Sequence, residues 1–248
     1  MINLGSPDST SIPDVKKYLD EFLMDKRVIG KSYIFRWILV KLIILNTRPK
    51  KSAKAYKRIW WKEGSPLIVL SERLFNKVEK ALDIPVALAM RYGSISINKG
   101  INKLVNKGIN EILVLPLYPH YAMSSYETVV EKVKEEVNDN FPDVKIKIVP
   151  PFYQNDQYID LLSSKIFNTI KKIQYDHILF SYHGIPVSHL KISDTTNNHC
   201  YKTNDCCNVK SAAHKTCYKH QVLETTKLVV EKLNIGEDKY SNSFQSRL

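Results

Sequence analysis

A histidine at the end of a predicted strand is the first residue of this sequence that is placed to do chemistry. His183 follows the apolar stretch at residues 177–181 and lies between Tyr182 and Gly184. In an α/β fold, a histidine at the carboxyl end of a strand can face a ligand crevice. Its imidazole can accept a proton near neutral pH or hold a divalent metal. The alternative is a core histidine bonded to the backbone, and the strand-end position favours the functional role.

All four cysteines of the chain lie close together in sequence, at Cys200, Cys206, Cys207 and Cys217. The paired Cys-x-x-Cys knuckles of structural zinc sites are absent. Adjacent cysteines can bind one iron or two neighbouring irons, and four thiolates satisfy a 2Fe–2S cluster. We favour that cluster over zinc, and either metal centre over four free thiols. His199, His214 and His220 could replace a thiolate, although four sulfurs make this unnecessary.

Two further strand ends carry polar and aromatic residues. Tyr118, Ser125 and Tyr126 follow one strand, where loops line a crevice in α/β folds. They are interpreted as the wall of a pocket, although turn and helix-cap chemistry also explains the serines there. Arg91 and Tyr92 end another strand, where the guanidinium could bind a carboxylate or form a surface salt bridge.

Composition argues for an ordinary globular chain and against a nucleic-acid binder. The 248 residues are 44% hydrophobic and 25% charged, with a net charge of +12. The lysines are spread over predicted helix faces, and no zinc-finger, RRM or KH pattern occurs. The first residues lack the basic start and apolar core of a secretory signal, so we expect a cytoplasmic protein with reduced or metal-bound thiols.

One apolar run, from Ile34 to Leu45, is followed by a basic run from Arg48 to Arg58. The apolar run is shorter than the roughly 20 residues of a transmembrane helix. It is interpreted either as a buried helix or as an apolar lip that touches a membrane or a greasy ligand. In the second case the basic run would meet anionic head groups, as a peripheral contact on the inner face of the cell membrane.

The order of elements predicts an α/β fold. Strands are expected at residues 86–90, 111–115, 145–149 and 177–181, and helices at 67–82, 96–106, 124–137, 156–172 and 220–233, with a further helix starting near Ser11. Strands separated by such helices imply parallel sheets covered on both faces. Two similar lobes are expected to meet near Pro150 and Pro151. The short first strand and the last six residues indicate a chain clipped at both ends.

Seven motifs occur in order along the chain and together span nearly its whole length. They are Asn3-Leu4-Gly5-Ser6-Pro7, Tyr18-Leu19-Asp20-Glu21-Phe22-Leu23, Arg48-Pro49-Lys50-Lys51-Ser52-Ala53, Glu63-Gly64-Ser65-Pro66, Met90-Arg91-Tyr92-Gly93, Leu115-Pro116-Leu117-Tyr118-Pro119 and Ser181-Tyr182-His183-Gly184-Ile185-Pro186. Together these motifs resemble those of the ferrochelatase family.

The resemblance implies two Rossmann-like, doubly wound lobes around a porphyrin cleft. These lobes are residues 1–150 and 151–248, with a cysteine-rich insertion at 197–219. It implies a lyase of haem biosynthesis that inserts Fe²⁺ into a porphyrin, with protoporphyrin IX favoured, and releases two protons. His183 matches the active-site histidine, which takes pyrrole protons or helps to deliver the iron. The resemblance and the strand ends together give a substrate-binding set of Leu4, Arg91, Tyr92, Tyr118, Ser125, Tyr126 and Tyr182.

The resemblance also bears on the cysteines, because certain bacterial members carry a 2Fe–2S cluster on an internal insertion of this kind. The family's second active-site residue, a glutamate in a C-terminal helix, has no counterpart in this sequence, which indicates a truncated form whose own activity is open. The alternatives are a tetrapyrrole-binding protein without catalysis and a cobalt or nickel chelatase on the same fold.

Overall fold

The computed structural model describes residues 1–245, which form two compact units. Unit 1 comprises Met1–Leu117 and Met123–Val149, and unit 2 comprises Tyr118–Ala122 together with the chain from Pro150 onward. The sequence-based division at residue 150 differs in one place, since residues 118–122 pack with the second unit. The expectation for the last three residues, 246–248, lies outside the described part of the chain.

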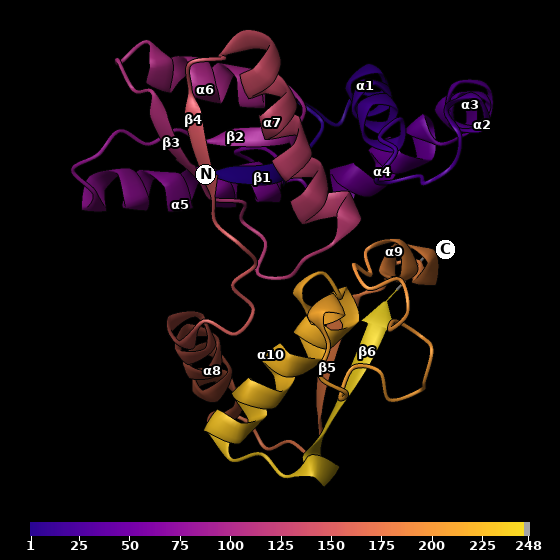
Figure 1. The fold of residues 1–248 in the computed structure, drawn as a ribbon, viewed down its shortest axis with the longest axis vertical. Helices are drawn as coiled ribbons and strands as arrows, with labels where there is room; N and C mark the ends of the chain where they lie inside the picture. Colours follow the sequence, from indigo (N-terminus) through magenta and orange to yellow (C-terminus); the bar gives the residue numbers. More distant parts are fainter. Residues whose placement is uncertain (246–248) are drawn as a thin grey trace. The chain divides into compact units, whose positions relative to one another are not determined.

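Unit 1 is built on four parallel strands (Figure 1). β1 (Ile2–Gly5) pairs with β2 (Ala89–Tyr92), and β3 (Glu111–Val114) pairs with β4 (Lys145–Ile148). Ile2 joins the two pairs, because its N–H donates to the Leu115 carbonyl over 2.9 Å and its carbonyl accepts from the Leu117 N–H over 2.8 Å. The resulting order, β2-β1-β3-β4, is that of a doubly wound α/β sheet.

One helix of unit 1, α1, begins at the cap that the sequence predicts. Ser11 accepts a hydrogen bond from the Asp14 N–H over 3.2 Å, and Pro13 lies in the first turn of α1. Val15 and Tyr18 bury the apolar face of this helix. The α-helices outside the apolar run are α1 (Ile12–Leu23), α4 (Pro49–Ile59), α5 (Pro66–Ala81), α6 (Ile97–Val105) and α7 (Thr128–Asn140), the last preceded by the π-helical η2 (Met123–Glu127).

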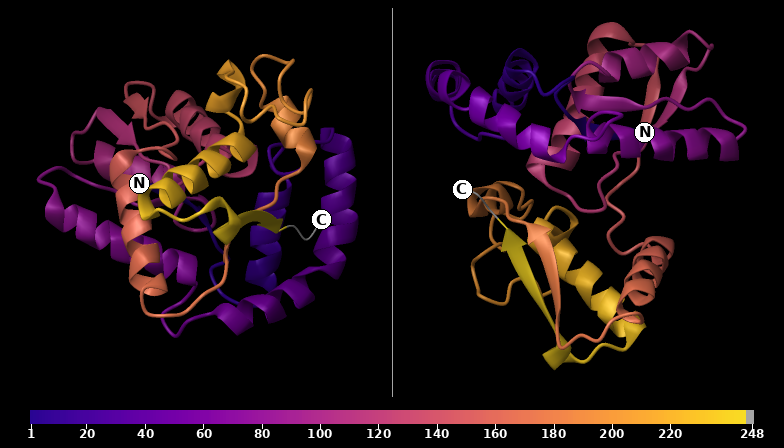
Figure 2. Two further views of the ribbon diagram at one scale, coloured as in Figure 1. Left: turned by 90° about the horizontal axis from the view of Figure 1, so that it is seen from below. Right: turned by 180° about the vertical axis from the view of Figure 1, so that it is seen from behind.

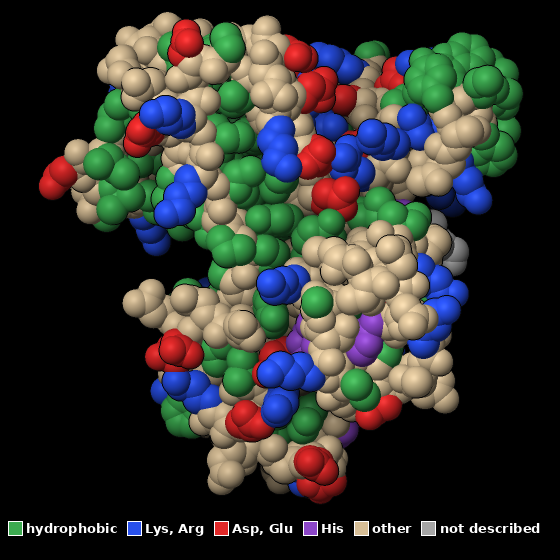
Figure 3. Space-filling model, viewed as in Figure 1, with side chains coloured by type: hydrophobic (Ala, Val, Ile, Leu, Met, Phe, Trp, Pro, Cys, Tyr) green, Lys and Arg blue, Asp and Glu red, His purple; other side chains and the backbone are tan. Residues whose placement is uncertain are grey.

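The apolar run does not form a buried helix. It is divided into α2 (Tyr33–Trp37), the π-helical η1 (Ile38–Ile44) and α3 (Leu45–Thr47). Ile34 is 72% exposed and Tyr33 is 64% exposed, whereas Arg36 is buried and donates to the Lys31 carbonyl over 2.8 Å. Figure 3 shows the resulting patch of hydrophobic side chains at the α2–α3 end of unit 1. The buried-helix interpretation is therefore wrong for half of this run, because Val40 and Leu45 are buried while residues such as Ile34, Leu42 and Ile43 face outward.

Unit 2 contains a parallel strand pair, β5 (Ile178–His183) and β6 (Tyr240–Gln245), whose register runs from Ile178↔Tyr240 to His183↔Gln245. α10 (Tyr218–Leu233) lies between them in sequence and packs across the pair, with α8 (Asp156–Ile170) beside it (Figure 2). The remaining elements are α9 (Val187–Ile192) and the short 3₁₀ turns η3 (Ala212–Lys215) and η4 (Glu237–Lys239).

The buried face of α10 is unusually polar for a helix that packs on a sheet. Gln221, Thr225 and Thr226 are all fully buried. The Gln221 Oε1 accepts from the Tyr121 N–H over 2.6 Å, and the Thr225 hydroxyl donates to the Tyr153 carbonyl over 2.8 Å. Buried polar groups need such partners, and the bond from Tyr121 to Gln221 holds residues 118–122 in unit 2. Across the described residues, none of the helices is both long and apolar enough to span a bilayer.

Candidate active site and candidate metal centre

The predicted catalytic histidine ends β5. His183 is exposed, and the Gly184 N–H after it donates to the Gln245 carbonyl of β6 over 2.6 Å. Tyr182 is half-buried, and its hydroxyl lies 2.7 Å from the Thr226 hydroxyl of α10. Burial raises the pKa of Tyr182. The strand end therefore presents His183 to solvent while Tyr182 anchors the backbone from the opposite face.

A second histidine supports this strand end. His120 Nε2 lies 2.9 Å from the Thr225 hydroxyl, and its ring meets Tyr182 and Tyr218 edge-on, with ring centroids 5.9 and 6.0 Å apart. Burial lowers the pKa of His120 to about 4, so the ring is neutral near pH 7. No individual role follows for His120 from the sequence, because its contacts with α10 could not be found from spacing alone.

The predicted residues of unit 1 gather at the carboxyl ends of β1 and β2. The register Gly5↔Tyr92 sets Leu4 beside Arg91 on the neighbouring strand. Leu4 is half-buried, Tyr92 is fully buried, and Arg91 has a side chain that is 13% exposed. This is the edge of a parallel sheet at which ligands of α/β proteins bind.

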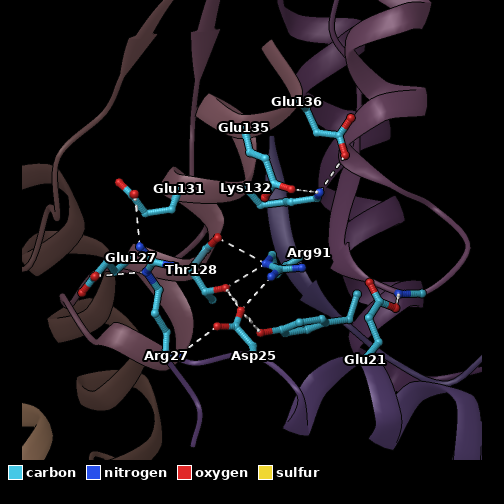
Figure 4. A network of polar contacts seen from close by, with 12 residues as sticks. Glu21, Asp25, Arg27, Arg91, Glu127, Thr128, Glu131, Lys132, Glu135 and Glu136 are labelled. Carbon is cyan, nitrogen blue, oxygen red and sulfur yellow. Dashed lines mark hydrogen bonds and ion pairs between the residues drawn. The ribbon is translucent and has the colours of Figure 1, made fainter. Parts of the chain in front are cut away.

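Asp25, which the sequence did not single out, is the centre of a polar network behind this edge (Figure 4). Its Oδ2 accepts from Arg91 Nη2 over 2.7 Å, from the Tyr92 hydroxyl over 2.9 Å and from the Thr128 hydroxyl in a very short contact. Burial would raise the pKa of Asp25. The hydrogen bonds from Thr128, the Arg27 N–H and Tyr92, together with the Arg91 charge, lower it below its ordinary value.

The loop after α1, which carries Asp25, also contacts η2 and α7 through Arg27, and η2 contains two other predicted residues. Arg27 Nε and Nη2 lie 3.1 Å from the carboxylates of Glu127 and Glu131. Ser125 and Tyr126 lie just before Glu127 in η2, and the Tyr126 hydroxyl donates to the Val149 carbonyl over 2.9 Å. π-Helical turns are rare and occur frequently at functional sites. Leu4, Arg91, Tyr92, Ser125 and Tyr126 thus all lie in unit 1, whereas Tyr118, Tyr182 and His183 belong to unit 2.

The four cysteines form one group in unit 2, and none is in a disulfide. Cys200, Cys206 and Cys217 are buried, and Cys207 is half-buried. Hydrogen bonds from Cys207 and Cys200 lower the pKa of Cys217 to about 6. Burial and then the charge of Cys217 raise the pKa of Cys200 to about 12. A thiolate shared among neighbouring thiols is the donor chemistry that iron–sulfur clusters and zinc both require.

These sulfurs are not arranged around a single ion. Within residues 1–245, no group of three or more His, Cys, Asp or Glu side chains is placed to hold one metal ion. The backbone nevertheless directs N–H groups at two of the sulfurs, since the Tyr201 and His220 N–H groups donate to Cys206 and Cys217 over 3.5 Å each. The donor set therefore fits a metal centre in its residue types and burial.

Comparison with known proteins gives the family. A sequence model of the ferrochelatase family matches residues 1–248. This chain belongs to the ferrochelatase family. It is 48% identical to the ferrochelatase of Opitutus terrae and 45% identical to that of Pseudomonas fluorescens strain Pf0-1, over 100% of this chain and 72% and 73% of those relatives. A ferrochelatase of Coxiella burnetii is 40% identical over 100% of this chain and 69% of its own length.

The family assignment confirms the α/β fold class and the predicted activity. Ferrochelatases are lyases that insert iron into protoporphyrin and form haem. The curated relatives compared above carry that name, so the two alternatives, a tetrapyrrole binder without catalysis and a cobalt or nickel chelatase, are not favoured.

Proposed function

We propose that this family member inserts Fe²⁺ into protoporphyrin IX with His183 as the group that accepts pyrrole protons. The observation that carries the proposal is the placement of His183, exposed at the carboxyl end of β5 and directly after the anchored Tyr182. A histidine imidazole can accept a proton near neutral pH. His183 would also be the first protein contact of the substrate iron.

The chemistry requires little beyond positioning and proton acceptance. Two pyrrole N–H bonds break, four Fe–N bonds form, and two protons leave. A neutral imidazole on one face of the macrocycle takes one proton at a time and passes it to water. Distortion of the flat macrocycle would expose its nitrogen lone pairs, with the strain supplied by binding of the remaining ring surface.

We infer that the substrate-binding residues are those that the sequence predicts, each considered within its own unit. Leu4, Arg91, Tyr92, Ser125 and Tyr126 would contribute from unit 1, and Tyr118 and Tyr182 from unit 2. The Asp25 carboxylate already neutralises the Arg91 guanidinium. Arg91 is therefore proposed to shape the site and to donate hydrogen bonds, and not to supply an unpaired positive charge.

We further propose that Cys200, Cys206, Cys207 and Cys217 hold a 2Fe–2S cluster. Support comes from the grouping of the four thiols, the burial of three of them and the backbone N–H groups that point at Cys206 and Cys217. Hydrogen bonds to sulfur are one of the ways in which a protein adjusts such a cluster. Zinc is the alternative occupant, and metal and sulfide analysis separates the two.

The exposed apolar run supports a peripheral contact with a membrane. Ile34, Leu42 and Ile43 are each more than half exposed, and the basic residues from Arg48 to Arg58 follow directly. A patch of this kind buries apolar side chains at the head-group boundary while its lysines and arginines meet anionic lipids. Cytoplasmic location, with this contact on the inner face of the membrane, stays a prediction.

The test of the proposed function is porphyrin metalation by the purified chain. Loss of porphyrin fluorescence is followed first with Zn²⁺ and then with Fe²⁺ under anaerobic conditions. Turnover with both metals is expected. Binding of porphyrin without turnover would mean that this chain binds porphyrin but does not metalate it, and would remove the proposed role of His183.

A further inference from the structure

Three histidine rings converge on the main chain of one dipeptide, Cys206–Cys207. His199 Nε2 and His214 Nε2 lie 2.6 and 3.2 Å from the Cys206 carbonyl oxygen. His220 Nδ1 lies 2.8 Å from the Cys207 carbonyl oxygen. A carbonyl oxygen only accepts hydrogen bonds, so the ring nitrogen in each contact must carry a proton.

The three rings also pack against one another. His214 and His220 are stacked, with ring centroids 3.6 Å apart and planes 9° apart. His199 meets His214 at 5.3 Å with planes 71° apart. The rings come from the loop before Cys200, from η3 and from α10, so three separate parts of unit 2 fix the same two peptide groups.

A carboxylate fixes the other end of the cysteine segment in a similar manner. Asp194 is buried, and its Oδ2 accepts from the His199 and Cys200 N–H groups over 2.8 Å each. Asp194 therefore orients both Cys200 and the loop that carries the first of the three histidines. Every one of these bonds ends on the main chain, and none of them uses a cysteine sulfur.

The arrangement argues against these histidines as substitute ligands through the nitrogens that make the contacts. A ring nitrogen that donates its proton to a carbonyl has no lone pair for a metal. What the rings do instead is set the direction of the Cys206 and Cys207 peptides, and with them the two adjacent thiols. Groups beyond the direct ligands of a metal are known to orient those ligands and to affect affinity.

We propose that His199, His214 and His220 are positioning residues that hold the Cys206–Cys207 dipeptide in the conformation needed to bind the metal centre, an inference that rests on the cluster proposed above. Removing His220 frees the Cys207 carbonyl, and removing His199 or His214 leaves the Cys206 carbonyl with one of its two donors. Either change lets the two thiols reorient. The cluster then assembles less completely and is lost faster. The rings themselves touch neither substrate nor iron.

The experiment measures cluster lifetime. The full chain is loaded anaerobically with Fe²⁺ and sulfide, and the half-time for loss of visible absorption is followed after addition of a chelator. His214→Ala and His220→Ala should lose the cluster about 10-fold faster than the unsubstituted chain. His214→Gln and His220→Asn place an amide N–H near the original donor and should recover most of the lifetime. His177→Ala removes a histidine bonded to Ser241, away from the cysteines, and should change nothing.

The outcomes distinguish failure of the cluster proposal from failure of the positioning role of the histidines. If the unsubstituted chain takes up zinc or no metal, the cluster proposal fails. If it holds a cluster and the alanine variants lose it at the unchanged rate, the positioning role is overturned. A readout that does not depend on how the variants fold is the ¹⁵N spectrum of histidine in the cluster-free chain. It should show Nε2–H for His199 and His214 and Nδ1–H for His220, and the opposite tautomers would refute the contacts.

Discussion

Arg91 Nη2 and Asp25 Oδ2 lie 2.7 Å apart, in an ion pair whose side chains are only 13% and 5% exposed. The pair joins the end of β2 to the loop that follows α1, far apart in the sequence. Thr128, at the start of α7, donates to the same carboxylate and accepts from Arg91 Nε over 2.8 Å. The geometry of the Arg91–Tyr92 strand end therefore depends on a carboxylate that no motif identified.

We expect Asp25→Asn to destabilise the chain by about 3 kcal/mol, because removing one partner leaves the buried Arg91 charge uncompensated. The porphyrin KM should also rise, since Arg91 and Tyr92 lose the group that orients them. Urea unfolding and steady-state metalation measure the two effects.

Glu63→Gln is the matched control for that substitution. It breaks the Glu63–Arg73 pair, whose side chains are 57% and 56% exposed, and should cost less than about 1 kcal/mol. Equal losses in the two variants would mean that burial of the Asp25–Arg91 pair has no special effect.

The stability of the chain should fall as the pH is lowered from 6.5 to 4, in part because of His120. Burial lowers the pKa of His120 from 6.5 to about 4 in the folded chain. In that window the unfolded chain binds the proton and the folded chain does not, so acid favours unfolding by up to about 3 kcal/mol from this residue. Tyr182 and Tyr218, which face the ring, stay neutral throughout this range.

His120→Gln tests this assignment. Glutamine keeps a hydrogen-bonding group for Thr225 but cannot titrate, so the slope of unfolding free energy against pH should become shallower between pH 6.5 and 4. His214, whose pKa burial also lowers, contributes in the same window and will leave a residual slope. An unchanged slope would show that His120 does not titrate as its burial implies.

His183→Ala should lower the rate of metalation by at least about 100-fold, the scale of a lost general base. Because His183 is exposed, the fold and the porphyrin affinity should hardly change. His177→Ala, near the start of the same strand, serves as the control. Near-normal turnover in His183→Ala would refute the assigned role.

Cys207→Ser should abolish the visible absorption of the reconstituted chain. The substitution is nearly isosteric and affects the half-buried cysteine, so the fold should persist. Iron and sulfide analysis of the unsubstituted chain completes the experiment. Four sulfurs bound to zinc, with no sulfide present, would favour the zinc alternative.

Ile34→Asp should weaken binding of the chain to vesicles that contain anionic lipid. Ile34 is 72% exposed, so the charge should leave stability nearly unchanged. Ile173→Asp, at a 57% exposed position in unit 2, is the control and should leave vesicle binding intact. If both variants bind vesicles as well as the unsubstituted chain, the apolar run is not the contact.

Much of the local structure could be predicted from the sequence. Ser11 marked the start of α1, and the apolar periodicity located α5, α6 and α8 to within a few residues. Strand positions were less certain, because pairing partners decide them. The strand expected at residues 86–90 begins instead at Ala89 and continues to Tyr92, where it pairs with β1 as far as Gly5.

The sequence by itself determined the family and the types of residue in the candidate sites. Motifs and strand ends consist of residues that are neighbours in the chain, so they can be recognised without a structure. The sequence named His183, Arg91, Tyr92 and the four cysteines. Only the tertiary structure could show that Asp25 neutralises Arg91, that His120 backs Tyr182, and that three histidines bind the Cys206–Cys207 carbonyls. These contacts join residues by packing and main-chain geometry, which leave no fixed spacing in a sequence.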